Sequence, residues 1–183
     1  MKKIHFTLFA AVAMLVACHG SAPKTEMAAT NGDFETSQEH PDGIQRMREY
    51  NYSDSVTVEG HTYFYTIHRE ASDSLPTVSD DEGVRYADNL YTLSLNEGTE
   101  FTQFTFSKRN FMSYLSPEFQ RNGILDGMML DKSLPGLRFA VSVSLPQSDM
   151  FEPLLLTIDP RGGMTIARDE RSDVELGGDD EGV

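Results

Sequence analysis

The 183-residue chain contains one cysteine and no tryptophan, and it is poor in basic residues. A single cysteine excludes an internal disulfide and any metal site built from several cysteines. Fifteen lysines and arginines stand against 29 aspartates and glutamates, which gives a formal net charge of −14. Because so acidic a chain repels phosphate backbones, we expect no nucleic-acid partner. Its 39% of hydrophobic residues are nevertheless enough to build the core of one domain.

The first residues have the pattern of an export signal. Lys2 and Lys3 precede an almost wholly apolar run over residues 4–15. This run is shorter than the roughly 20 apolar residues that a transmembrane helix needs. A basic start followed by an apolar stretch of this size predicts a secretory signal peptide over residues 1–17.

The signal ends in a motif that carries its own chemistry. Leu15-Val16-Ala17-Cys18 resembles the lipobox of bacterial lipoproteins. In that class the cysteine thiol takes a diacylglycerol, the signal is cut just before it, and the new amino group takes a further acyl chain such as palmitate. The resemblance therefore implies lipid attachment at Cys18, where several acyl chains give durable membrane binding. The alternative is that Cys18 is a free thiol or a core residue.

The residue after Cys18 bears on location. In bacteria where an aspartate there retains lipoproteins in the inner membrane, His19 implies transport to the outer membrane. Residues 20–24 lack the compact acidic cluster that sends some Bacteroidota lipoproteins to the cell surface. We expect an outer-membrane lipoprotein facing the periplasm, with display at the cell surface as the alternative.

Composition divides the remaining chain into three parts. Residues 18–50 are small, polar and charged, and we expect a lipid anchor and flexible tether, with a helical turn near residues 44–47. Residues 51–168 are predicted to form the folded domain. Residues 169–183 contain seven acids, and we expect a disordered, solvated tail.

The domain shows mainly the two-residue period of strands. Leu137, Phe139, Val141, Val143 and Leu145 alternate with smaller or polar residues, which predicts a half-buried strand. Hairpin turns are expected at Gly60, at Asn96-Glu97-Gly98 and over residues 159–163. Further strands are predicted over residues 56–59, 61–69, 84–86, 91–95, 101–107, 124–130, 154–158 and 164–168.

One segment departs from this period. Phe111, Leu115 and Phe119 recur at helical spacing, and Ser116-Pro117-Glu118 is a typical helix start. We expect one helix, or two short helices separated at Pro117, near residues 108–122. The predicted fold is mainly β (α+β): a single antiparallel β sandwich or barrel-like sheet of about eight strands with one helical insert.

No residue pattern predicts a catalytic or metal site. The odd separation of His61 and His68 would place them on opposite faces of one strand, so we interpret these histidines and His40 as ordinary surface or core residues. No His-Glu-x-x-His motif and no Gly-x-Ser-x-Gly motif occurs. We therefore predict no catalytic residue, no metal and no cofactor.

Acidic and aromatic clusters each leave two interpretations open. Asp80-Asp81-Glu82-Gly83-Val84, which recurs as residues 179–183, is expected to form an exposed turn, with a cation site as the alternative. Tyr63-Phe64-Tyr65 and the Phe101, Phe104, Phe106 series would place aromatic rings on both faces of their strands. One face would be core and the other would lie beneath the helical insert; the alternative is a ligand pocket or a partner-binding patch.

Several short motifs together resemble an uncharacterised family of Bacteroidota lipoproteins built around one domain of unknown function. They lie between about residues 55 and 168: Gly60-His61-Thr62-Tyr63, Ser74-Leu75-Pro76-Thr77-Val78, Tyr86-Ala87-Asp88-Asn89, Phe106-Ser107-Lys108 with Phe111, and Gly123-Ile124-Leu125. The resemblance implies an envelope lipoprotein and supplies no activity, ligand or catalytic residue.

The sequence thus predicts a lipid-anchored, non-enzymatic binding or accessory module of the bacterial envelope. Its partners would be the membrane, through Cys18, and an envelope protein. One alternative is a barrel-type carrier of a small apolar ligand. The other is a hydrolase that uses paired carboxylates on the β domain.

Overall fold

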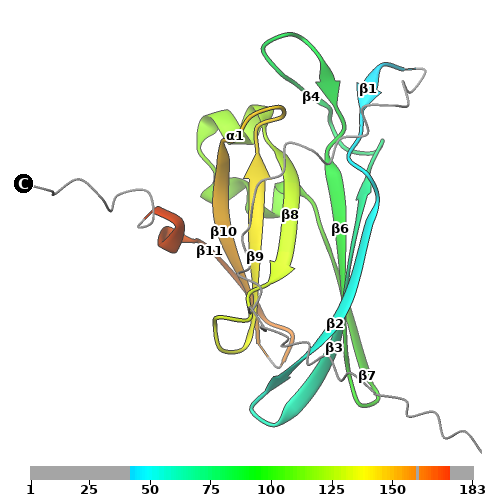
Figure 1. The fold of residues 1–183 in the computed structure, drawn as a ribbon, viewed down its shortest axis with the longest axis vertical. Helices are drawn as coiled ribbons and strands as arrows, with labels where there is room; N and C mark the ends of the chain where they lie inside the picture. The colour runs from blue at the N-terminus through cyan, green and yellow to red at the C-terminus, as the bar shows by residue number, and fades with distance from the viewer. Residues whose placement is uncertain (1–41, 160, 174–183) are drawn as a thin grey trace, which may run out of the picture.

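The computed structural model describes residues 42–159 and 161–173, and they form a mainly β domain (Figure 1). The strands make two four-stranded antiparallel sheets and one small three-stranded sheet. This confirms the predicted class, and within the described part the strands form a sandwich that does not close into a barrel. The interpretations of residues 1–41, Cys18 among them, and of residues 174–183 lie outside the described residues.

The first sheet has the order β2-β3-β6-β7. Its strands are β2 (Tyr50–Val58), β3 (His61–Ala71), β6 (Asn89–Glu97) and β7 (Glu100–Phe106). Glu59 and Gly60 both have positive φ in the two-residue turn between β2 and β3, the geometry that matches the twist of a hairpin. The hairpins predicted at Gly60 and Gly98 are confirmed.

The second sheet has the order β11-β10-β9-β8. It consists of β8 (Ile124–Leu130), β9 (Leu137–Ser144), β10 (Phe151–Ile158) and β11 (Met164–Arg168). The strand predicted over residues 137–145 is confirmed as β9, and its predicted inward residues Leu137, Phe139, Val141 and Val143 are buried. The strand is buried beyond the predicted half, because Ala140 and Ser144 on its other face are buried as well, and it ends before Leu145. A β-bulge interrupts β8 between Leu125 and Gly127.

The two sheets face each other and enclose the core (Figure 1). Alternate residues of β3 and β6 point into the core, among them Tyr65, Ile67 and Leu93. They meet Phe139, Val141 and Leu156 from the other sheet. The ring centroids of Tyr65 and Phe139 lie 6.2 Å apart in an edge-on arrangement. The opposite face of each strand is thereby directed away from the partner sheet.

Two short helices follow β7, as the alternative with a break at Pro117 predicts. The 3-10 helix η1 spans Lys108–Tyr114, and α1 spans Pro117–Asn122 with Pro117 in its first turn. Phe111 and Phe119 belong to the core cluster between the sheets. Gly123 ends α1 without a positive φ; a Cβ there would lie 2.7 Å from both the Phe119 carbonyl oxygen and Val143 Cγ1.

A small third sheet corrects the predicted tether. β1 (Ile44–Gln45) pairs in parallel with β5 (Arg85–Tyr86), and β5 pairs with β4 (Val78–Ser79). The helical turn expected near residues 44–47 is therefore wrong. The reason is that this strand depends on a partner about forty residues away and leaves no local signal. Met47 packs with Val78, Tyr86 and Ile124 in a second apolar cluster.

The described part also extends past residue 168. η2 spans Glu170–Asp173. Asp169 is buried, which corrects the prediction that it belongs to the solvated tail. Arg171 Nη2 donates to Asp169 Oδ2 at 2.6 Å and to Asp131 Oδ2 at 2.8 Å. The domain boundary therefore lies beyond Asp169. No helix in the described residues is long and apolar enough to cross a membrane.

Candidate functional site

The outer face of the β2-β3-β6-β7 sheet carries uncharged side chains at the end with the β2–β3 and β6–β7 hairpins, while His68 and Glu70 lie toward its other end. The strand register places Phe64 in one row with Ser55, Asn96 and Phe101. The next row and the hairpin end supply hydroxyl and amide groups. We call these ten residues the polar face: Ser53, Ser55, Thr57, Thr62, Phe64, Thr66, Ser94, Asn96, Phe101 and Gln103.

Phe64 and Phe101 are exposed on this face. Their exposed fractions are 59% and 61%, whereas Tyr63 and Tyr65, the neighbours of Phe64, are buried. The prediction that aromatic residues occupy both faces is confirmed. The expectation that the second face lies beneath the helical insert is wrong, because Phe111 and Phe119 direct the insert into the core between the sheets. Two exposed phenylalanine rings in one row of a sheet make this face the candidate binding surface.

Hydrogen bonds between neighbouring strands order the polar groups of this face. The Ser53 and Thr66 hydroxyls lie 2.8 Å apart, and those of Thr57 and Thr62 lie 3.1 Å apart. Gln103 Nε2 donates to Ser94 Oγ at 3.1 Å. Each hydroxyl has one donor and two acceptor positions, so these bonds leave hydrogen-bonding capacity for a ligand.

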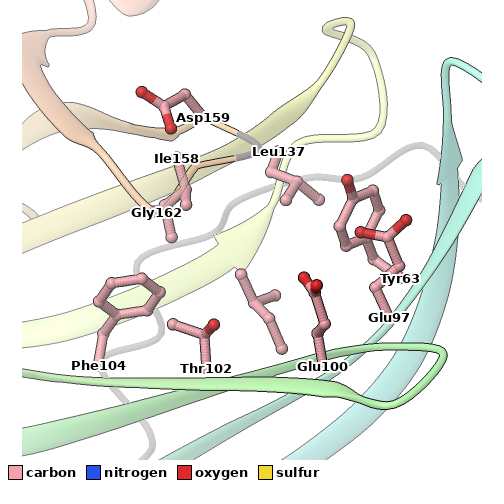
Figure 2. Close-up of a pocket in the computed structure, with 10 residues that line it drawn as sticks. Tyr63, Glu97, Glu100, Thr102, Phe104, Leu137, Ile158, Asp159 and Gly162 are labelled. Atoms are coloured by element: carbon pink, nitrogen blue, oxygen red, sulfur yellow. The ribbon is translucent and has the colours of Figure 1, made fainter.

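A small hollow lies at the end of the sandwich where the β6–β7 hairpin meets the turn after β10 (Figure 2). It has a volume of about 40 Å³. Sites for small organic ligands are usually about 300–1,000 Å³. The hollow therefore has room for water-sized molecules, and it does not provide the apolar chamber that a carrier would need.

Three carboxylates line this hollow, and two of them have partners in the fold. Glu97 is paired with His61 Nδ1. Burial, together with the nearby Glu97 carboxylate, raises the pKa of the Tyr63 hydroxyl. Asp159 Oδ1 accepts the backbone N–H groups of Arg161 at 2.7 Å and Gly163 at 2.9 Å, which fixes the turn between β10 and β11. Glu100 lies opposite Glu97 across the β6–β7 hairpin.

The two described histidines lie apart, on opposite faces of β3 as their spacing predicts. His61 pairs with Glu97, and His68 Nε2 lies 2.9 Å from Glu49 Oε1 on the outer face. His40 lies outside the described residues. Among the described residues, no group of three or more histidine, cysteine, aspartate or glutamate side chains is arranged to hold a metal ion.

The acidic segment at residues 80–84 forms a turn. Asp80 Oδ1 accepts the backbone N–H groups of Glu82 at 3.0 Å and Val84 at 2.9 Å, while Tyr86 Oη donates to Asp80 Oδ2 at 2.9 Å. These bonds lower the pKa of Asp80, although its partial desolvation opposes them. Gly83 has a φ of +81°. The predicted turn is confirmed for this copy, and the copy at residues 179–183 lies outside the described residues.

A buried polar cluster joins the two sheets, and the sequence analysis did not identify it as one. Asp88 Oδ1 accepts the backbone N–H groups of Leu125 and Asn89, each at 2.8 Å. Asn89 Nδ2 donates to the Leu125 carbonyl oxygen at 2.9 Å. Because β8 is the edge of its sheet, these side chains supply hydrogen-bond partners that a further strand would otherwise provide. In the sequence these residues belong to Tyr86-Ala87-Asp88-Asn89 and Gly123-Ile124-Leu125, motifs of the family resemblance that give no indication of a bond between them.

The bulge in β8 is held by the same cluster. The Asp126 carbonyl oxygen accepts hydrogen bonds from Tyr91 Oη at 2.5 Å and Arg69 Nη1 at 3.1 Å. Ser142 Oγ donates to Asp126 Oδ1 at 2.7 Å. Burial raises the pKa of the Asp126 and Asp88 carboxyls, and burial lowers the pKa of the nearby Lys108 ammonium. The Asp88 and Asp126 groups take part in bonds that hold β8 in place, and these residues do not line the hollow in Figure 2.

Comparison with known proteins identifies a family to which the chain is similar. The family described as "Domain of unknown function (DUF4738)" matches residues 30–166. The matched stretch includes β1 to β10 and most of β11, and it begins well before the residue near 55 at which the sequence resemblance starts. No curated protein matches the chain.

Proposed function

The chain belongs to the DUF4738 family, and we propose from its own residues that it is a lipid-anchored, non-enzymatic binding module of a bacterial envelope. Cys18 would carry the lipid, and the sandwich would present the polar face to a partner. The outer membrane would hold the protein, on its periplasmic side or at the cell surface. A Bacteroidota source is part of this proposal.

The anchor is supported by the sequence around Cys18. A basic start, an apolar run and Leu15-Val16-Ala17-Cys18 occur in the order that lipoprotein processing requires. The net charge of −14 disfavours contact between the domain and anionic headgroups. Attachment would therefore depend on the acyl chains, and the domain would remain free to meet a partner.

The observation that carries the binding role is the exposure of Phe64 and Phe101 among the uncharged side chains at the hairpin end of the outer face. Exposing two phenylalanine rings forgoes the stabilisation that their burial would give. The β3–β6–β7 pairing fixes their relative positions before any ligand arrives. A pre-ordered aromatic surface lowers the entropic cost of binding.

The two alternatives have less support. A barrel-type carrier lacks its barrel in the described part, and the hollow in Figure 2 is too small for an organic ligand. The carboxylates that line that hollow, and that a hydrolase there would draw on, are Glu97, Glu100 and Asp159. Glu97 is already paired with His61, and Asp159 accepts the backbone N–H of Gly163 in the turn between β10 and β11.

A crosslinking experiment in living cells tests the binding role. A photoreactive residue at Gln103 on the polar face should yield a specific adduct with an envelope component, protein or carbohydrate. The same residue at exposed Asp149, on the connection between β9 and β10, should yield none. If neither position gives an adduct with the lipidated chain, the proposed binding role of this surface is wrong.

A further inference from the structure

We propose that the polar face binds a neutral polysaccharide, with Phe64 and Phe101 stacking on its sugar rings. This inference rests on the proposed role as a binding module and names the class of its partner. It follows from the chemistry of the face, the spacing of the two rings and the poor fit of other partners.

The first argument is the kind of hydrogen bonding that the face offers. Eight of its ten residues carry a hydroxyl or an amide, and none carries a charge. Hydroxyl and amide groups both donate and accept, as sugar hydroxyls do. The bond from Gln103 to Ser94 and the pair of Ser53 with Thr66 hold these groups in fixed rows. A polyhydroxylated chain lying along the rows would find donors and acceptors without having to neutralise a charge.

The second argument is the placement of the rings. Phe64 on β3 and Phe101 on β7 share a row, with Asn96 on the intervening strand. Two strand spacings of about 4.8 Å put their backbones about 10 Å apart, comparable to the length of a disaccharide. The C–H groups on one face of a pyranose ring pack favourably on an aromatic face, whose quadrupole is negative. Asn96 is placed to bond sugar hydroxyls between the two stacking positions.

The composition of the face argues against a protein partner. Protein interfaces are enriched in aromatic residues, methionine and arginine and depleted in serine. Apart from Phe64 and Phe101, the polar face contains none of the enriched types, and it includes three serines: Ser53, Ser55 and Ser94. Pairing with a second copy would press two rows of hydroxyls together, whereas packed sheets interdigitate apolar side chains.

Charge complementarity selects among polysaccharides. Anionic glycans and lipid phosphates require lysine or arginine, and the ten residues of the polar face include neither. The chain as a whole is strongly acidic and would repel such ligands. A cationic ligand would meet no carboxylate among these ten residues; Glu49 and Glu70 lie farther along the outer face, near His68. A neutral glycan is the class that fits.

Binding is tested with the natively processed chain, solubilised in a detergent without a sugar headgroup. Native gels cast with a panel of soluble neutral polysaccharides should retard the wild-type protein in at least one gel. F64A and F101A should each weaken that binding by about tenfold, a change of about 1.4 kcal/mol. F64W, which keeps a stacking ring, should bind at least as well as the wild type. The control M150A removes an exposed apolar side chain away from the polar face, on the connection between β9 and β10, and should bind normally.

The possible outcomes separate this inference from the proposed function. Failure of the wild type to bind any neutral polysaccharide overturns the inference, as does binding that survives the F64A/F101A double substitution. A protein adduct at Gln103 without polysaccharide binding would keep the binding module and reject the glycan. A dimer in sedimentation analysis that dissociates in F64A would show that a second copy occupies the face. Unchanged thermal unfolding of F64A and F101A would establish that lost binding is not lost folding.

Discussion

The Asp88 carboxylate accepts the backbone N–H of Leu125 at 2.8 Å and so joins the segment before β6 to the edge strand β8 of the other sheet. The same oxygen accepts the N–H of Asn89 at 2.8 Å. A buried acid thus fixes the relative position of the two layers at this corner. The polar face depends on that arrangement, because β6 is a central strand of its sheet.

Removing this carboxylate should destabilise the domain. We expect D88A to lower the free energy of unfolding by about 3 kcal/mol, because two buried N–H groups lose their acceptor. D88N keeps one carbonyl oxygen and should lose less. Urea unfolding measures both, with exposed D149A as the control. Equal stability of D88A and the control would show that the Asp88 bonds contribute nothing.

The lowered pKa of Asp54 leads us to expect that the folded domain loses stability in acid. Lys132 Nζ donates to Asp54 Oδ2 at 2.6 Å, and this bond, with those from Ser55 and Tyr52, lowers the pKa of Asp54 from 3.8 to about 2. The stabilisation is complete above pH 3.8 and is lost as pH falls through the folded pKa. D54N should therefore lose less stability than the wild type over that interval. Urea midpoints at a series of pH values measure this; parallel curves would contradict it.

For Asp126 we expect the opposite pH dependence, a loss of stability as the pH rises. Burial raises its pKa above 3.8, so the folded chain holds this proton more tightly than the unfolded chain does. Its contribution to stability therefore falls as pH rises from 3.8 through the folded pKa. D126N cannot titrate, and its stability relative to the wild type should improve over that interval. The same urea series with D149N as control tests it, and an improvement toward acid would reverse the assigned direction.

Gly123 should tolerate no side chain. A Cβ there would meet the Phe119 carbonyl oxygen and Val143 Cγ1, each at 2.7 Å, and the carbonyl belongs to the backbone of α1. We expect G123A to cost about 1–3 kcal/mol of unfolding free energy through overpacking. N122A, at an exposed position one residue earlier, is the matched control. Calorimetric melting curves that coincide for the two variants would show that α1 moves aside without cost.

Local patterns were enough to predict much of the sandwich. The alternation over residues 137–145 predicts β9 because each buried residue is followed by a smaller or more polar one. The Gly60 turn and the Ser116-Pro117 helix start depend on backbone preferences that act within a few residues. These elements were therefore visible without knowledge of their partners.

Long-range pairing was not visible in the same way. β1 exists because Ile44–Gln45 lie beside Arg85–Tyr86, and the buried bonds of Asp88 depend on Leu125 in the opposite sheet. The period of two placed Phe64 opposite Tyr63 and Tyr65 but could not say which face would meet water. The polar face was therefore left between two interpretations until the helical insert was located. Only the register showed that Phe64, Asn96 and Phe101 share a row.

The measurement that tests the central proposal most directly is the intact mass of the natively expressed chain. A lipid-anchored module predicts that residues 1–17 are absent and that Cys18 carries a thioether-linked diacylglycerol with an acylated amino group. The C18S variant should keep residues 1–17 and gain no lipid mass. A wild-type mass that includes residues 1–17, or that leaves the Cys18 sulfur unmodified, would contradict the envelope assignment.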